Sequence, residues 1–270
     1  MGEFELLALL RERLPTAGSQ VRLGSGDDAA VTVPGGAVAT SVDALVEGVH
    51  FRRETATLRQ IGRKALSTAL SDLAAMGAAP GEAYVWLGAP EDMDEAALLE
   101  VGEGLAEVAG ETGTTVAGGD LTRAPVLSLA VTVTGHAPKP DDFVTRGGAH
   151  PGDVLVVTGE LGGAAAGLAL IEEPTLAGDP DPRQGLERPS AQRLDAQAAD
   201  ALRRRQLDPT PRLAAGRALA VAGATAMIDV SDGLAGDAGH IATASAALLV
   251  IDAEALPIAP GVAAVAAATG

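Results

Sequence analysis

Five short segments of this chain place an aspartate beside glycine or serine. Carboxylates that converge in a fold repel one another unless cations lie between them. Carboxylate and hydroxyl oxygens are hard ligands that favour Mg2+, which usually also binds phosphate oxygens and water. The sequence therefore predicts a site for Mg2+ and a nucleotide phosphate. The segments are Gly26-Asp27-Asp28, Ser41-Val42-Asp43, Ser71-Asp72, Gly118-Gly119-Asp120 and Asp229-Val230-Ser231-Asp232-Gly233.

The composition narrows the classes of protein to which the chain can belong. It has 270 residues, 47% hydrophobic but only 2% aromatic, so its core must be built from alanine, valine and leucine. The formal net charge of -17 argues against nucleic acid and anionic membranes as partners, since both attract basic proteins. The absence of cysteine excludes disulfides and thiolate sites. The N-terminus lacks the basic start of a signal peptide, and no apolar run reaches about 18 residues, so we expect a cytoplasmic protein.

The first half is predicted to alternate strands and helices around the acidic segments. In the strand at 37–43, alternation places Ser41 and Asp43 on one face, where a hydroxyl and a carboxylate can share a cation. In the helix at 58–76, Asp72 falls within the apolar arc, which is costly unless the carboxylate is paired or binds a metal. The alternative is a fraying helix end that leaves Asp72 in water. Further helices are expected at 3–14 and 95–112, and strands at 82–87, 114–117 and 126–135.

The second half follows a proline-containing linker at 138–142. Asp229 ends a predicted strand, and ligands of α/β sheets bind at that end of the strands. Ser231 and Asp232 begin the next helix, so either of them could be only its N-cap. Arg146, in a glycine-rich loop, could meet a phosphate or simply lie on the surface. The predicted strands are 153–158, 226–230 and 248–251, and the predicted helices are 164–171, 191–205, 211–221 and 234–245.

The order of these motifs resembles the thiamine-monophosphate kinase family, of the superfamily that includes aminoimidazole ribonucleotide synthetase. The resemblance covers nearly the whole chain, and its motifs together are highly specific. They are Gly-Asp-Asp at 26–28, Ser-x-Asp followed by Glu-Gly-Val-His-Phe within 41–51, Leu-Ser-Asp-Leu-Ala-Ala-Met-Gly at 70–77, Gly-Gly-Asp-Leu-Thr-Arg at 118–123, Thr-Arg-Gly-Gly-Ala-x-Pro-Gly-Asp at 145–153 and Ile-Asp-Val-Ser-Asp-Gly-Leu at 228–234.

The resemblance implies ATP-dependent transfer of a phosphoryl group onto thiamine monophosphate, giving thiamine diphosphate and ADP. Because both reacting groups are phosphates, we expect direct in-line transfer assisted by several Mg2+ ions, without a covalent nucleophile. The implied metal ligands are Asp28, Ser41, the backbone of Val42, Asp43, Asp72, Asp120, Asp229 and Asp232. The implied ATP contacts are Gly119, Asp120, Arg146 and Ser231, and the implied contact to thiamine monophosphate is His50. The family position of Val42 is commonly threonine, so a side-chain ligand is lost there.

The same resemblance implies a fold and an assembly. The fold class is α/β (α+β), with an N-terminal domain at 1–138 that carries the metal and ATP site and pairs its sheet with a second copy in a homodimer. The C-terminal domain, at 139–270, is expected to be incomplete, because the family's Gly-Gly-Glu-Asp-Tyr-Glu-Leu segment would come after Gly270. In the family that segment supplies a substrate-binding glutamate.

Two other functions stay open at the level of sequence. One is another ATP-using synthetase of the superfamily, although selenophosphate synthetase fits less well because its reactive N-terminal cysteine or selenocysteine is missing here. The other is a nucleotide-binding remnant that keeps the metal site without turnover, which the missing substrate segment would explain. Turnover of thiamine monophosphate distinguishes the kinase from the remnant.

Overall fold

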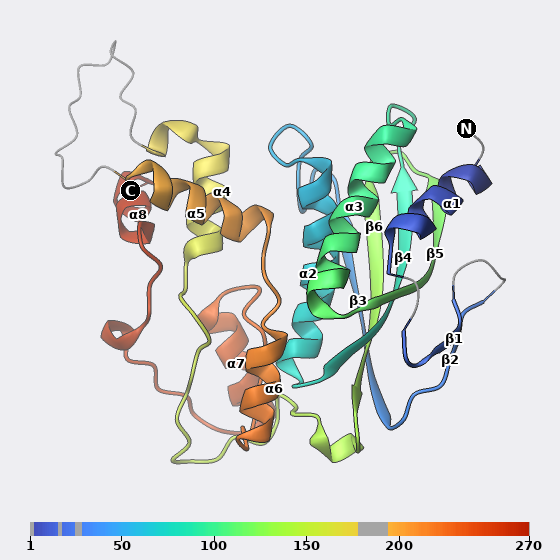
Figure 1. Ribbon diagram of the computed structural model, residues 1–270. Coiled ribbons are helices and arrows are strands. Elements are labelled where there is room, and N and C mark those ends of the chain that lie inside the picture. Colours follow the sequence, from blue (N-terminus) through green and yellow to red (C-terminus); the bar gives the residue numbers. More distant parts are fainter. Residues whose placement is uncertain (1–2, 16–17, 25–28, 178–193, 270) are drawn as a thin grey trace, which may run out of the picture.

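The computed structural model describes residues 3–15, 18–24, 29–177 and 194–269. The first half of the chain forms a sheet covered by helices, and the second half is a group of helices joined by extended segments (Figure 1). This mixture of helices and sheet confirms the predicted fold class. Within the described residues, no helix is both long enough and apolar enough to cross a bilayer.

Four strands form the main sheet, in the spatial order β3-β6-β4-β5. Strands β4 and β5 run parallel and are connected by a helix, whereas the other neighbours are antiparallel. Strands β3 and β5 are therefore the two edges of the sheet. The bounds are β3 Ala37–Val46, β4 Ala79–Ala89, β5 Thr115–Arg123 and β6 Ser128–Ala137, and a separate small sheet pairs β1 Val21–Leu23 with β2 Val31–Thr32.

Helices α2 and α3 lie side by side across one face of the sheet, and α1 packs against α3 (Figure 1). Helix α2 begins at a capping box, in which Thr57 and Gln60 each accept the other's backbone N–H. The two helices approach closely at Gly62, where an added Cβ would lie 2.0 Å from the carbonyl oxygen of Val101. The bounds are α1 Glu3–Arg13, α2 Leu58–Ala75 and α3 Glu95–Thr112.

The two faces of the sheet have different surroundings. The face toward α2 is lined by buried leucine and valine side chains, and Ser41 and Asp43 of β3 lie half-buried at its edge. On the opposite face, which we call the outer face, Val42 is 64% exposed and Trp86 is 37% exposed. The predicted separation of Ser41 and Asp43 from Val42 by strand alternation is confirmed.

The second half contains five α-helices within the described residues. Helices α4, α5 and α8 share a small apolar core around Leu170 and Leu202, and α6 packs on α2. At that contact a Cβ on Gly216 would lie 2.0 Å from the carbonyl oxygen of Ala74. Their bounds are α4 Gly163–Glu172, α5 Ala196–Leu207, α6 Leu213–Val221, α7 Leu234–Ala244 and α8 Val262–Thr269, with short 3-10 turns at Pro140–Asp142, Pro174–Ala177 and Ala253–Ala255.

An ion pair also connects the two halves. The guanidinium Nε of Arg63, in α2, lies 2.8 Å from Oδ1 of Asp208, which directly follows α5. The same guanidinium binds Glu107 and Glu111 of α3 at 3.0 and 2.8 Å. The hydrogen bond to Glu111 foremost, and that to Asp208, raise the pKa of Arg63. The bond to Asp208 fixes the end of α5 against α2.

The predicted strands of the second half are wrong. Residues 153–158, 226–230 and 248–251 are extended segments without ladder partners among the described residues. Val154 is 83% exposed and Val250 is 84% exposed, so apolar β-forming residues alone did not make a strand. Two smaller differences remain. Strand β5 continues beyond the predicted end at 117, through Gly118–Asp120 to Arg123, and the alanine-rich end forms helix α8, which was not predicted.

Candidate functional site

The first part of the site joins β3 to α2. The hydroxyl of Ser41 donates a hydrogen bond to Oδ2 of Asp72, and both side chains are half-buried. Asp72 is therefore a hydrogen-bonded carboxylate within the fold, not a solvated side chain at a frayed helix end. Asp43 lies two residues along the same face of β3, and its Oδ1 accepts the backbone N–H of Ala44 at 2.8 Å.

The second part of the site joins α2 to the second half of the chain. The hydroxyl of Ser71 donates a hydrogen bond of 2.9 Å to Oδ2 of Asp229, although the two residues are 158 positions apart. Burial, reinforced by the negative charge of Asp72, raises the pKa of Asp229, while the Ser71 hydrogen bond opposes that shift. Two carboxylates from different halves are thus close enough to repel each other.

Together, Ser41, Asp43, Ser71, Asp72 and Asp229 form what we call the acidic cluster. Its donors are all carboxylate and hydroxyl oxygens, the set that suits Mg2+, and the mutual repulsion of Asp72 and Asp229 is what a cation would relieve. Within the described residues, no three carboxylate or imidazole groups are near enough to hold a metal by themselves. A cation here would therefore need water or phosphate oxygens as well, which is usual for Mg2+.

The backbone at the edge of the sheet can contribute a further oxygen. The N–H of Ala44 binds Asp43 and so points away from β6. Because alternate residues of a strand direct their peptide groups to the same side, the carbonyl of Val42 also points to the free edge. This placement is compatible with the backbone role that the resemblance implies for Val42.

The loop before α7 is held by a residue that the sequence did not single out. Oδ2 of Asp237, which is 3% exposed, accepts backbone N–H groups from Ser231, Asp232 and Gly233 at 3.0, 3.2 and 3.2 Å. The side chains of Ser231 and Asp232 remain exposed beside Asp229 in the chain. The available signal was an aspartate in the first turn of a predicted helix, where a carboxylate can bind free N–H groups.

Arg146 lies in a second loop of this half, and its side chain is exposed. Ser245, at the end of α7, accepts the N–H groups of Gly148 and Ala149 at 3.2 and 3.1 Å and donates to the carbonyl of Arg146 at 3.2 Å. The loop is therefore ordered at its backbone while the guanidinium stays accessible to an anion.

Asp120 and Gly119 do not join the acidic cluster within one chain. Cross-strand pairing places Asp120 in a row with Trp86, Ala130 and Ala44 on the outer face, at the edge opposite to β3. Three strand spacings amount to about 14 Å. The predicted ligand set is therefore divided between the two faces and the two edges of the sheet.

The remaining predicted residues are His50 and Asp28. His50 follows β3 and is exposed, and its Nδ1 accepts the N–H of Val46 at 3.1 Å. Asp28, like its neighbour Asp27, lies outside the described residues.

Known proteins share both halves of this architecture. Residues 26–137 match the N-terminal domain, and residues 150–265 the C-terminal domain, of AIR synthase related proteins. Thiamine-monophosphate kinases of Mycobacterium tuberculosis and Escherichia coli K12 are each 39% identical to this chain across 95% of it, which corresponds to 70% and 73% of their own lengths.

Solved structures agree with these relatives. The thiamine-monophosphate kinase of Stenotrophomonas maltophilia K279a superimposes with a TM-score of 0.80 at 37% identity, over 97% of this chain and 78% of that one. A structure described as AaThiL complexed with AMPPCP and TMP gives a TM-score of 0.65 at 28% identity, over 91% of this chain and 71% of that one. The chain therefore belongs to the thiamine-monophosphate kinase family, within the AIR synthase related proteins.

Proposed function

We propose that this protein phosphorylates thiamine monophosphate to thiamine diphosphate with ATP and Mg2+. The observation that carries the proposal is the acidic cluster, in which Asp72 and Asp229 converge from the two halves of the chain. Relatives at 39% identity bear the name of this kinase, and a similar solved structure holds AMPPCP and TMP.

The proposed mechanism is direct transfer between two phosphates. Bound Mg2+ would offset the repulsion between the two anions and fix them in line. Asp43, Asp72 and Asp229, with the hydroxyls of Ser41 and Ser71, would supply protein ligands to Mg2+, and phosphate and water oxygens would complete the coordination. The attacking phosphate oxygen is already ionised near neutral pH, so no side chain has to remove a proton. Arg146 and the loop of Ser231 and Asp232 would orient the nucleotide.

The experiment is to incubate the protein with ATP, Mg2+ and thiamine monophosphate and to measure thiamine diphosphate by chromatography. Free thiamine is the control substrate, and omission of Mg2+ or addition of a chelator is the control for the metal. We expect product from thiamine monophosphate only. Nucleotide binding without product would instead favour the non-catalytic remnant. Stable phosphate label on the protein after ATP alone would contradict direct transfer.

The division of the predicted ligands supports a second proposal, that two copies assemble through the sheet. The outer face carries mainly small, β-branched and aromatic side chains, among them Val42, Thr132 and Trp86, with Asp120 at its β5 edge. Charged side chains usually protect an exposed sheet from pairing. We expect a homodimer by light scattering. Thr132→Arg should yield monomers, whereas Val221→Arg, on an exposed side chain of α6, should not. A monomeric parent protein would contradict the proposal.

We also propose that the chain divides into two domains near residue 138 and that the protein is cytoplasmic. Two separate apolar cores, one around the sheet and one around α4, α5 and α8, support division of the chain into two domains. An isolated fragment 1–138 should show whether the first domain is stable without Leu213, which the second half contributes to the first core.

A further inference from the structure

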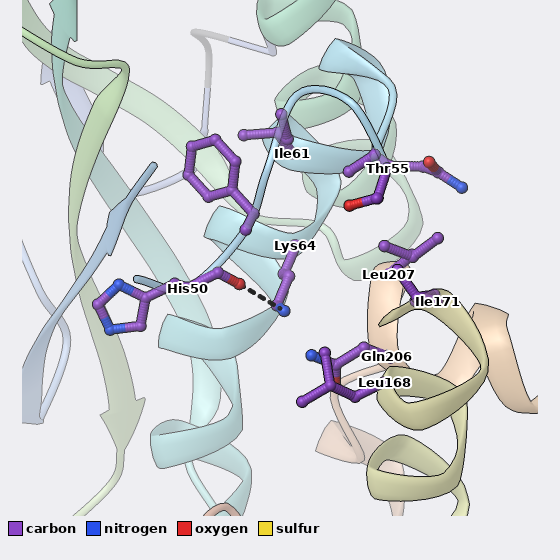
Figure 2. Close-up of a pocket in the computed structure, with 11 residues that line it drawn as sticks. His50, Thr55, Ile61, Lys64, Leu168, Ile171, Gln206 and Leu207 are labelled. Carbon is purple, nitrogen blue, oxygen red and sulfur yellow. Dashed lines mark hydrogen bonds between the residues drawn. The ribbon is translucent and has the colours of Figure 1, made fainter. Parts of the chain in front are cut away.

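A small pocket lies between the two halves of the molecule, on the part of α2 that precedes Asp72 by about two helical turns. Its walls are largely apolar and include Phe51. Ile61 lies on one side of the pocket, and Leu168, Ile171 and Leu207 lie on the other (Figure 2). The ammonium group of Lys64 is the charged group in this lining. The cavity volume is only about 40 Å³, so it can take a small apolar part of a ligand next to the ammonium group of Lys64.

The surroundings of Lys64 differ from those of its basic neighbours. Arg59 and Arg63, in the same helix, both pair with Glu107 of α3. Within the described part of the chain, Lys64 has no ion pair and donates one hydrogen bond, of 3.3 Å, to the carbonyl oxygen of His50. Burial lowers the pKa of Lys64, which marks an ammonium that has lost water without gaining a carboxylate.

The chemistry of the whole chain makes this lysine unusual. The chain has 19 basic residues against 36 acidic ones, and only Lys64 and Lys139 are lysines. Carboxylates are therefore abundant as potential partners, yet none pairs with Lys64 among the described residues. A half-buried cation without an internal partner is costly to the fold and is compensated when a ligand supplies the negative charge.

The position of Lys64 relative to the acidic cluster indicates which anion fits. Lys64 and Asp72 are eight residues apart on α2, about 12 Å along the helix axis. The segment from Ser41, in β3, to His50 runs alongside α2, with the Ser41–Asp72 hydrogen bond at its start and the His50–Lys64 hydrogen bond at its end. Asp43 lies between these two contacts. An acceptor whose phosphate lies between Asp43 and Lys64 would direct part of its organic body towards the apolar pocket.

We propose that Lys64 binds the phosphate of the acceptor and thereby selects thiamine monophosphate over free thiamine. This inference rests on the proposed function, and it assigns the kinase's preference for a phosphorylated acceptor to one side chain. A charge-assisted hydrogen bond to a phosphate is lost entirely when the acceptor carries a neutral hydroxyl, so the discrimination is intrinsic to the site. The ligand class is a phosphate monoester with an apolar or aromatic body.

The test compares Lys64→Met and Lys64→Arg with Lys139→Met, a control at the exposed second lysine. We expect Lys64→Met to raise KM for thiamine monophosphate by about 10- to 100-fold, the loss of one charge-assisted contact. KM for ATP should stay unchanged, and Lys64→Arg should recover part of the loss. Melting temperatures should show that all three variants fold.

Two results would overturn the assignment while leaving the kinase intact. One is an unchanged KM for thiamine monophosphate in Lys64→Met, and the other is a raised KM for ATP alone. If the parent protein gives no thiamine diphosphate, the proposed function fails separately, and calorimetric titration with inorganic phosphate in the absence of Mg2+ still tests the site. Binding that Lys64→Met abolishes and Lys139→Met keeps supports the phosphate site, and equal binding by both variants overturns it.

Discussion

At the scale of single residues, Asp229 is the carboxylate through which we expect pH to affect the proposed metal binding. Its folded-state pKa is raised, so its contribution to stability is present below the unfolded-state pKa and is lost as the pH rises through the folded-state value. At neutral pH the ionised carboxylate therefore destabilises the metal-free protein, and Mg2+ should relieve this strain. The acidic cluster should accordingly bind Mg2+ less well as the pH falls.

Asp229→Asn tests this coupling. We expect the variant to melt at a higher temperature than the parent at pH 7 without metal, with the difference disappearing under acidic conditions. In a chain of this size each kcal/mol corresponds to about 2–4 °C. Mg2+ should stabilise the parent more than the variant. Asp141→Asn, at an exposed carboxylate far along the chain, is the control, and an equal rise in that variant would refute the explanation.

Asp237 acts through the backbone of the loop that carries Ser231 and Asp232. Asp237→Ala leaves three N–H groups without their acceptor, so we expect a loss of about 2–3 kcal/mol in the free energy of unfolding. Asp237→Asn keeps one carbonyl acceptor and should lose less. Mg2+–ATP affinity, measured by calorimetry, should fall in the same order. Parent-like affinity in the alanine variant would show that the loop is positioned by other contacts.

At the scale of elements, the contact between α6 and α2 determines where Asp229 lies. Gly216→Ala would place a methyl group against the carbonyl of Ala74, and overpacking of this kind costs about 1–3 kcal/mol. Because α6 leads into the segment of Asp229, the variant should also bind Mg2+ more weakly. Gly239→Ala is the matched control, since an added Cβ in α7 meets no atom within 4 Å. It should be neutral or slightly stabilising.

The helices and strands also show how much of the fold local sequence patterns predict. Helical periodicity and caps predicted α2 and α3 nearly to the residue, because Gly113 and the residues around Gly77 provide local stop signals. Strand alternation placed Ser41 and Asp43 correctly. The segments at 153–158 and 248–251 have the same β-forming composition but lack neighbouring strands, and no local pattern contains that information.

The candidate site also has features that local sequence patterns predict and features that depend on tertiary packing. Motif order predicted the candidate carboxylates. Asp72, which the sequence placed within the apolar stripe of α2, is hydrogen-bonded to Ser41. The hydrogen bond between Ser71 and Asp229 depends on α6 packing against α2, and the remoteness of Asp120 depends on the strand order. Both features depend on tertiary structure, which local sequence patterns do not contain. Asp237 and Lys64 were not predicted, because only the folded chain shows which N–H groups Asp237 binds and that Lys64 has no carboxylate partner among the described residues.

At the scale of the whole molecule, the extended segments of the second half expose apolar side chains. Val156 is 64% exposed, and Val250 is 84% exposed. A chain with such segments should bind the dye anilinonaphthalene sulfonate. Val156→Lys combined with Val250→Lys should reduce that fluorescence with little change in melting temperature, since surface substitutions usually stay within about 0.5 kcal/mol. Val221→Lys, an isolated exposed position on α6, should leave the dye signal unchanged, and an equal decrease there would contradict the assignment.

Because aromatic residues are scarce in this chain, tryptophan fluorescence reports on the outer face of the sheet. Trp86 is the chain's one tryptophan, its indole N–H binds the hydroxyl of Thr122 at 3.0 Å, and its ring is partly open to water. Emission excited at the red edge of the absorption band therefore comes from this single place. If a second copy covers the outer face, dilution should shift the emission to longer wavelength and make it more accessible to quenchers. The protein thus carries an intrinsic fluorophore at the surface where its assembly is proposed.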